Sequence, residues 1–173
     1  MTRATSQTGT PNTPAPAAAD VRVELVSNPA YLCAMREMVG VICKRTGFVD
    51  AIASKVVLAV DEALANVMNH GYERRHDGRI WISIFRETDA LSGKVNGLRI
   101  VMEDEGRQVD PCLIKSRNLD DIRPGGLGVH IIKEVMDVVI YERREGKGMR
   151  LTLSKRLPAE NDQQQLSPGG PCG

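Results

Sequence analysis

The sequence predicts an α+β fold, a two-layer α/β sandwich in which helices cover one face of a mostly antiparallel sheet. Two observations lead to this prediction. In the N-terminal half, apolar residues recur at helical spacing over about residues 29–45 and 50–70. Elsewhere, β-rich runs come in pairs that are joined by polar, glycine-containing connections, which is typical of antiparallel hairpins.

The first strand and the first helix follow each other closely. Residues 21–26 alternate between apolar and polar side chains with the period of a strand. Asn28 and Pro29 then supply an N-cap and a first-turn proline for a helix that runs to about Arg45 and ends at Gly47. Its apolar stripe is either a core face or a partner surface, and we expect a core face formed by Met35, Met38, Val39 and Ile42.

A second helix is expected over about residues 50–70, with Gly71 as its C-terminal stop. Its apolar stripe comprises Val57, Val60, Leu64 and Val67. The remaining strands are expected at residues 80–85, 98–102, 138–141 and 149–153. They form two hairpins, and a short helix over about 126–137 follows the irregular segment 104–125.

Composition limits the classes of function. The 173 residues predict one domain over residues 20–156 between flexible tails at 1–19 and 157–173, because the tails are poor in large apolar side chains. A formal charge of +1 does not favour binding to nucleic acid or to an anionic membrane. The four cysteines and three histidines lack zinc-ligand spacing, and no apolar run has the length of a signal peptide or membrane span. We therefore expect a cytoplasmic protein with reduced thiols.

Glu62 and Asn66 are one helical turn apart, on a face away from the apolar stripe. A carboxylate at this place can accept a proton from an attacking hydroxyl, and an amide oxygen is a ligand suited to Mg²⁺. Taken alone, such a pair is more often a solvated helix face.

Asp104 and Gly106 follow an apolar strand directly. The carboxylate can accept a hydrogen bond from an exocyclic amine such as that of adenine, and the glycine permits close approach of a flat base. Asp and Gly are also common in ordinary strand-end turns.

A glycine-rich run precedes the third helix and comprises Gly125, Gly126, Leu127 and Gly128, followed by Val129. Free backbone amides at a helix N-terminus attract anions, and phosphate is the obvious ligand. Arg123 could reach a terminal phosphate from the preceding loop, although a lone arginine beside glycines is often a solvated charge.

In this order, the three motifs resemble those of the GHKL superfamily of ATPases and kinases, the Bergerat or histidine-kinase-like ATPase fold, over about residues 20–155. Two stretches look most similar to bacterial anti-sigma factor serine/threonine kinases. They are Glu62-Ala63 with Asn66 and His70-Gly71-Tyr72, and Gly125-Gly126-Leu127-Gly128 with Met136-Asp137.

The resemblance implies a Mg-ATP site. Glu62 would be the general base, and Asn66 would coordinate Mg²⁺. Asp104 and Gly106 would hold adenine. The phosphates would lie against the glycine-rich run and Val129, with Arg123 on a lid. The chain departs from the family where Met149 follows Gly148, since the family often has threonine there.

The resemblance also implies an activity and partners. The chain would phosphorylate an anti-sigma factor antagonist of the STAS type and regulate a sigma factor by partner switching. The resemblance leaves open whether the chain forms a homodimer. One alternative is a nucleotide-gated binding module without kinase activity, in which ATP orders residues 107–124, but the presence of Glu62 argues against it. A second alternative is the catalytic domain of a histidine kinase, but 173 residues leave no room for a helical phosphoacceptor domain beside it.

Overall fold

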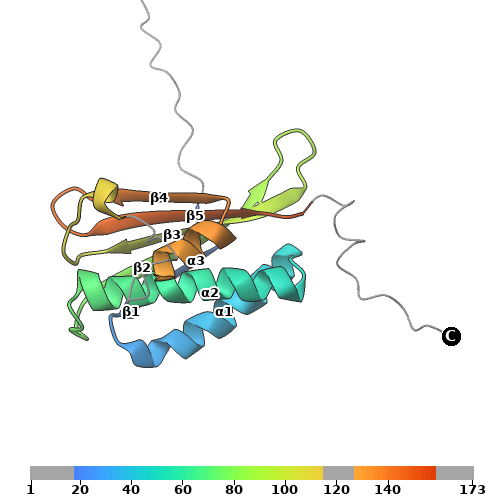
Figure 1. Cartoon of the computed structure of the whole chain (residues 1–173). Coiled ribbons are helices and arrows are strands. Elements are labelled where there is room, and N and C mark those ends of the chain that lie inside the picture. Colours follow the sequence, from blue (N-terminus) through green and yellow to red (C-terminus); the bar gives the residue numbers. More distant parts are fainter. Residues whose placement is uncertain (1–17, 115–126, 159–173) are drawn as a thin grey trace, which may run out of the picture.

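The structure is a computed structural model of the chain, and it describes residues 18–114 and 127–158. The strands are β1 (Val21–Val26), β2 (Arg79–Thr88), β3 (Val95–Asp104), β4 (Val138–Arg143) and β5 (Met149–Arg156). They form a five-stranded sheet in the order β1-β2-β3-β5-β4, and each neighbouring pair is antiparallel. The α-helices of the described residues are α1 (Leu32–Thr46), α2 (Asp50–Asn66) and α3 (Leu127–Val135), and they lie against one face of this sheet (Figure 1). The predicted α+β two-layer sandwich is therefore confirmed.

The burial pattern of the central strands shows which sheet face is covered. On β2, Ile80, Ile82 and Ile84 are fully buried, whereas the residues between them are partly exposed. Their partners on β3, at positions 100, 102 and 104, are buried as well. Because side chains alternate along a strand, one face belongs to the core under the helices and the other is open.

The N-terminal capping prediction is confirmed in part. The Asn28 side chain accepts a hydrogen bond from Ala30 N at 3.0 Å, and Gly47 ends α1 in a left-handed conformation with φ of 112°. The proline begins a 3-10 turn, Pro29–Tyr31, before the α-helix starts at Leu32. The predicted core face of α1 is confirmed, since Met35 and Val39 are buried and the other two predicted residues pack against the core.

The second helix differs from the prediction at its end and on its buried face. The α-helix stops at Asn66, and residues Val67–Gly71 form a turn of π-helix, η2, closed by a 2.9 Å hydrogen bond from Tyr72 N to Val67 O. The buried residues are Ala53, Val56, Ala59, Val60, Ala63 and Leu64. Val57 and Val67 are only partly buried. The buried face is wider than the predicted stripe because α2 contacts both α1 and α3, and small alanines allow close packing there.

The C-terminal elements follow the prediction. β4 and β5 form the expected hairpin, and α3 precedes them. Leu157, just after β5, donates its backbone N–H to Asn96 O at 2.8 Å and packs against the core. Most of the two tails predicted at 1–19 and 157–173 falls outside the described residues, as does half of the irregular segment predicted before α3. No helix of the described part of the chain is long and apolar enough to cross a membrane.

Candidate functional site

A cavity of about 330 Å³ opens between the end of α2 and the edges of β3 and β5. This volume lies at the lower end of the range for small-molecule sites, about 300–1,000 Å³. The lining comes from four places in the sequence: the α2–η2 junction, β3 with the segment that follows it, the start of α3, and the β4–β5 hairpin. It comprises Ala63, Asn66, Val67, His70, Gly71, Met102, Asp104, Arg107, Val109, Leu113, Ile114, Val129, Tyr141, Met149 and Leu151. Mostly apolar walls with few polar groups suit a flat, partly polar ligand.

Asp104 is the buried carboxylate of this cavity. It ends β3 opposite Ile80, so its side chain faces the helices, and it is only 4% exposed. Its Oδ1 accepts hydrogen bonds from Gly106 N at 2.7 Å and from Met149 N at 3.3 Å. Burial raises the pKa of Asp104 although these two bonds and the Arg144 charge favour the ionised form. The sequence places a carboxylate here, and the structure adds that the amide of Met149 holds it.

Gly106 brings the chain after β3 against the π-helical turn. A Cβ at Gly106 would come within 2.6 Å of the Gly71 carbonyl oxygen, and Arg107 N donates to the same oxygen at 2.8 Å. The close approach that requires glycine at this position is therefore to the backbone of η2. This contact fixes η2 beside Asp104, with the Cβ position of Gly71 3.9 Å from Asp104 Oδ1.

Tyr72 buttresses the loop that carries Asp104. Its hydroxyl accepts a hydrogen bond from Glu105 N at 2.8 Å and donates to the Arg79 carbonyl, and the residue is 2% exposed. Burial raises the pKa of Tyr72, so the hydroxyl keeps its proton at neutral pH. Gly78 is needed next to it, because a Cβ there would overlap the Tyr72 ring. Sequence reasoning placed Tyr72 in a motif but assigned it no contact.

Glu62 and Asn66 meet the start of α3 at Gly128. A Cβ built on Gly128 would lie 2.6 Å from Glu62 Oε2 and 3.4 Å from Asn66 Nδ2. The two side chains predicted to share a helix face therefore do share one, and it faces the N-terminal turn of α3. The missing side chain at Gly128 leaves the room in which a carboxylate, an amide and a helix N-terminus converge.

Asn66 fits a role toward a charged ligand. Its Nδ2 is buried and has no hydrogen-bond partner among the residues that the structure describes. A buried amide without a partner costs free energy, and a ligand oxygen or a metal-bound water would satisfy it; the amide oxygen is suited to Mg²⁺. Among the described residues, no three His, Cys, Asp or Glu side chains are grouped to hold a metal ion. A magnesium ion here would therefore depend on Asn66, phosphate oxygens and water.

The predicted site residues are distributed as follows. Asn66, Asp104 and Val129 line the cavity, and Glu62 and Gly128 lie against its Asn66 end. Leu127 is 59% exposed at the start of α3. Arg123, Gly125 and Gly126 lie outside the described residues.

Sequence reasoning missed most of the apolar wall. The inward-facing positions of β3 and β5, Met102, Met149 and Leu151, were a detectable signal, since they alternate with exposed residues. Tyr141, from β4, also lines the cavity, and burial raises its pKa to about 12. His70, an exposed residue of η2, lines the cavity as well.

Comparison with known proteins gives a consistent result. A family model described as a histidine kinase-like ATPase domain matches residues 25–155. The serine-protein kinase RsbW of Listeria monocytogenes serotype 4a is 27% identical over 145 residues, covering 82% of this chain and 92% of the relative. RsbW of Staphylococcus aureus strain RF122/ET3-1 is 26% identical over 149 residues, covering 81% and 88%. The serine/threonine-protein kinase BtrW of Bordetella bronchiseptica is 29% identical over 110 residues, covering 61% and 72%. The resemblance drawn from the three motifs is confirmed.

Proposed function

The chain belongs to the histidine kinase-like ATPase domain family, and from that premise we propose that it is an anti-sigma factor serine/threonine-protein kinase that uses Mg-ATP. Its substrate would be a small anti-sigma factor antagonist of the STAS type, and partner switching between antagonist and sigma factor would follow from the phosphorylation. The names of the similar kinases support the activity. We also propose that the protein is cytoplasmic and forms a homodimer. The ATPase domain would lie between flexible tails at 1–19 and 157–173.

The observation that carries this proposal is the contact of Gly128 with Glu62 and Asn66 at one end of a cavity that has Asp104 in its wall. The proposed general base, an amide and a helix N-terminus meet there. The carboxylate that would recognise the nucleobase lies in the same cavity. Phosphoryl transfer depends mainly on positioning and charge stabilisation, and such a set of groups suffices.

The adenine would lie among the apolar wall residues with its exocyclic amine toward Asp104. Oδ1 of Asp104 is already held by two backbone amides. The second carboxylate oxygen has no hydrogen bond within the described residues, so it can accept one from the amine. Gly106 acts by keeping η2 and the loop after β3 in contact beside this carboxylate.

The phosphates would extend toward α3. The amides at its N-terminus, near Gly128 and Val129, would bind them, together with those of Gly125, Gly126 and the exposed residue Leu127. Arg123 would contact the terminal phosphate. Mg²⁺, when bound beside Asn66, supplies charge neutralisation for the phosphate oxygens.

Glu62 would act on the protein substrate. Its carboxylate accepts the proton of a serine or threonine hydroxyl as that oxygen bonds to the γ-phosphorus and the bond from the γ-phosphorus to the bridging oxygen of ADP breaks. The products are a phosphoserine or phosphothreonine and ADP. Because Glu62 lies against Gly128, the base would be held close to the phosphate-binding amides.

The test adds the purified protein, γ-labelled ATP and Mg²⁺ to a native lysate that has been treated with phosphatase and then with phosphatase inhibitor. Glu62→Gln is the control, and its retained binding of ADP is measured by calorimetry. We expect an acid-stable label on a small protein that is absent with the variant. Equal labelling with both proteins would remove Glu62 as the base. Binding of ATP by the wild-type protein without any labelled protein would favour a nucleotide-gated binding module.

A further inference from the structure

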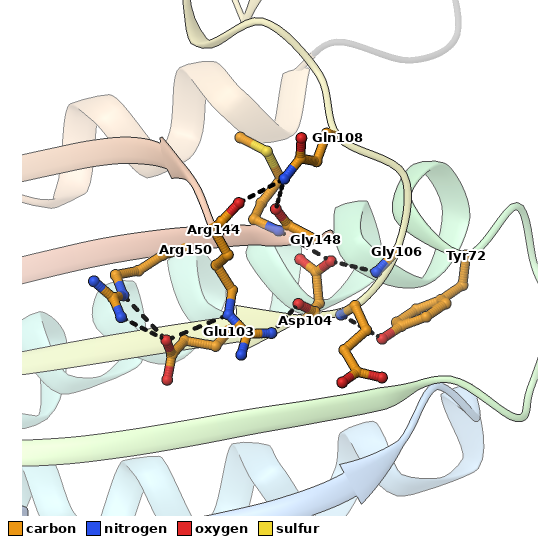
Figure 2. A network of polar contacts seen from close by, with 10 residues as sticks. Tyr72, Glu103, Asp104, Gly106, Gln108, Arg144, Gly148 and Arg150 are labelled. Atoms are coloured by element: carbon orange, nitrogen blue, oxygen red, sulfur yellow. Dashed lines mark hydrogen bonds and ion pairs between the residues drawn. The ribbon is translucent and has the colours of Figure 1, made fainter. Parts of the chain in front are cut away.

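Arg144 contacts Asp104 but has no role in the proposed phosphoryl transfer. It lies in the turn after β4, and its Nη1 donates a hydrogen bond of 2.5 Å to the carbonyl oxygen of Asp104. Its Nε lies 3.6 Å from Glu103 Oε1, and its guanidinium carbon lies 5.3 Å from the centre of the Trp81 ring. Figure 2 shows the Arg144 guanidinium between Glu103 and Asp104. The Arg144 side chain is 27% exposed.

The backbone of Arg144 is fixed from the other direction. The Gln108 amide donates to the Arg144 carbonyl at 2.7 Å and to the Gly148 carbonyl at 3.2 Å (Figure 2). Arg144 N also donates to Gly148 O at 3.1 Å. The hairpin turn and the loop after β3 therefore hold each other, and Arg144 is bonded to that loop both by its side chain and by its main chain.

The same turn also contacts Asp104 through glycine. Gly148 has φ of 80°, and a Cβ there would overlap the Asp104 carbonyl. The next residue, Met149, donates its N–H to the Asp104 carboxylate. Both polar ends of Asp104, its carbonyl and its carboxylate, are thus bonded to the β4–β5 turn.

We infer that Arg144 is a positioning residue for nucleobase recognition: its charged hydrogen bond fixes the Asp104 peptide, so that the carboxylate faces the adenine amine. This inference rests on the proposed function. A charged donor on a buried carbonyl is among the stronger hydrogen bonds in proteins, and its geometry restricts the peptide that carries the carboxylate. Arg144 acts through Asp104 and would not itself touch the nucleotide.

Arg144 also contributes to the electrostatic surroundings of the carboxylate. Burial raises the pKa of Asp104, whereas the hydrogen bonds from Gly106 N and Met149 N, and after them the Arg144 charge, act in the opposite direction. Other charged or titratable groups near this carboxylate include Tyr72, the flanking Glu103 and Glu105, and the cavity-lining His70, Arg107 and Tyr141. Tyr72 and Tyr141 have raised pKa values, and Arg107 is engaged with Glu73 at 3.8 Å. Arg144 is thus the cation that is hydrogen-bonded to the Asp104 residue within the described part of the chain.

The test compares ADP with inosine diphosphate, which has a carbonyl in place of the amine and the same ribose and phosphates. Affinities are measured by calorimetry without metal on wild type, Arg144→Gln, Arg144→Lys and Arg150→Gln. Arg150 is the matched control, because it bonds the same Glu103 oxygen at 2.9 Å and has no bond to Asp104. Circular dichroism and thermal unfolding check the fold of each variant.

We expect Arg144→Gln to weaken ADP binding about tenfold while inosine diphosphate binding changes less than about twofold, since one charge-assisted hydrogen bond is lost. Arg144→Lys keeps the charge and should stay within about threefold of wild type for both ligands. Arg150→Gln should bind both as wild type does. Unchanged ADP affinity in Arg144→Gln, an equal loss for both ligands, or the same loss in Arg150→Gln would each overturn the inference.

A second variant serves if Arg144→Gln does not fold. Arg144→His can be charged or neutral within one folded protein, because an imidazole titrates near pH 6.5. Relative to wild type, its ADP affinity should fall about tenfold between about pH 5.5 and pH 8. The same pH dependence in both proteins would overturn the inference. Wild-type protein that binds no adenine nucleotide would overturn the proposed function as well, and this outcome is distinct from a failure of Arg144 alone.

Discussion

Gly128 and Glu62 are in contact between the start of α3 and α2, since a methyl group on Gly128 would lie 2.6 Å from Glu62 Oε2. The contact involves the far end of a flexible side chain, so the carboxylate can move away without disturbing the backbone. A larger residue at position 128 would therefore leave the fold intact but would displace the carboxylate of Glu62, the proposed general base.

Gly128→Ala should therefore lower phosphoryl transfer about 10- to 100-fold, because the base is displaced by about 1 Å or more. Stability should be unchanged or up to about 1 kcal/mol higher, since alanine favours the helix over glycine. Gly40→Ala is the control, as it lies in α1 with only an ordinary 3.6 Å contact to Val57. Labelled-phosphate transfer and urea unfolding give the two quantities. A Gly128→Ala variant with wild-type transfer would contradict the placement of Glu62.

Asp104→Asn should weaken ATP binding about 10- to 100-fold, because the amide NH₂ would face the donating amine of adenine. The same variant should be more stable than wild type at neutral pH. The pKa of Asp104 is raised in the fold, chiefly by burial, so ionisation above this pKa costs stability, and asparagine avoids that cost.

The stability difference should shrink as the pH falls through the raised pKa and disappear below the ordinary pKa of aspartate, where Asp104 is protonated in both the folded and the unfolded chain. Urea unfolding across the acid range measures it, and calorimetry measures ATP binding. A variant that is less stable at pH 7 yet equal to wild type in acid would show that the carboxylate charge stabilises the fold.

Asn66→Ala should weaken binding of Mg-ADP about tenfold and binding of metal-free ADP by less than about threefold, if the amide oxygen ligates the metal. Removing the amide also removes the buried Nδ2, which has no partner in the described part of the chain, so the variant should not lose stability by more than about 1 kcal/mol. Asn69→Ala, at an exposed position of η2, is the control. Equal losses with and without Mg²⁺ would exclude the metal role.

Gly148→Ala and Gly146→Ala test the turn that holds Asp104. Both glycines have φ near 80°, but a Cβ at Gly146 meets nothing within 4 Å, whereas at Gly148 it would overlap the Asp104 carbonyl. Gly146→Ala should cost about 1 kcal/mol from the left-handed conformation alone, and Gly148→Ala about 3 kcal/mol or more. Urea unfolding distinguishes the two. Similar losses would mean that the overlap relaxes without cost.

The fold was predictable where the signal is local. Alternation at Ile80, Ile82 and Ile84 identifies a half-buried strand, and the glycines of residues 145–148 identify the hairpin turn. The end of α2 was not predictable, because the π-turn is held by residues that are distant in the sequence. Gly106 packs against the Gly71 backbone, and the Tyr72 hydroxyl accepts a hydrogen bond from Glu105 N. Helical periodicity cannot distinguish a last α-turn from a π-turn.

The candidate site shows the same division. Glu62, Asn66 and Asp104 could be predicted from the sequence. Each has a residue type that suits its proposed chemistry, and the motifs that contain them follow each other in the order of the family. Arg144 carries no such signal: it is one of several arginines, and its role depends on a contact across 40 residues of sequence. Positioning residues of this kind become visible only when sheet register places them beside a functional group.

Asp137 fixes the connection between α3 and β4 to the end of β5, and its pH dependence is testable. Partial burial raises the pKa of Asp137, but the hydrogen bonds from Lys155 Nζ at 2.8 Å and Arg156 N at 2.7 Å outweigh this, so the pKa lies below its ordinary value. A depressed pKa stabilises the fold above the unfolded-state pKa, and this stabilisation is lost as the pH falls through the folded-state value.

Asp137→Asn should therefore lower the free energy of unfolding by about 1 kcal/mol at pH 7, a modest loss because the pair is partly exposed. The difference from wild type should shrink to zero as the pH falls below the ordinary range for aspartate. Asp77→Asn is the control, since its pairing with Arg75 is 3.7 Å long and exposed, and it should leave stability within about 0.5 kcal/mol at every pH. Urea unfolding between acid and neutral pH measures both. A loss in Asp137→Asn that persists unchanged in acid would mean that packing, and not the charge, supplies the stabilisation.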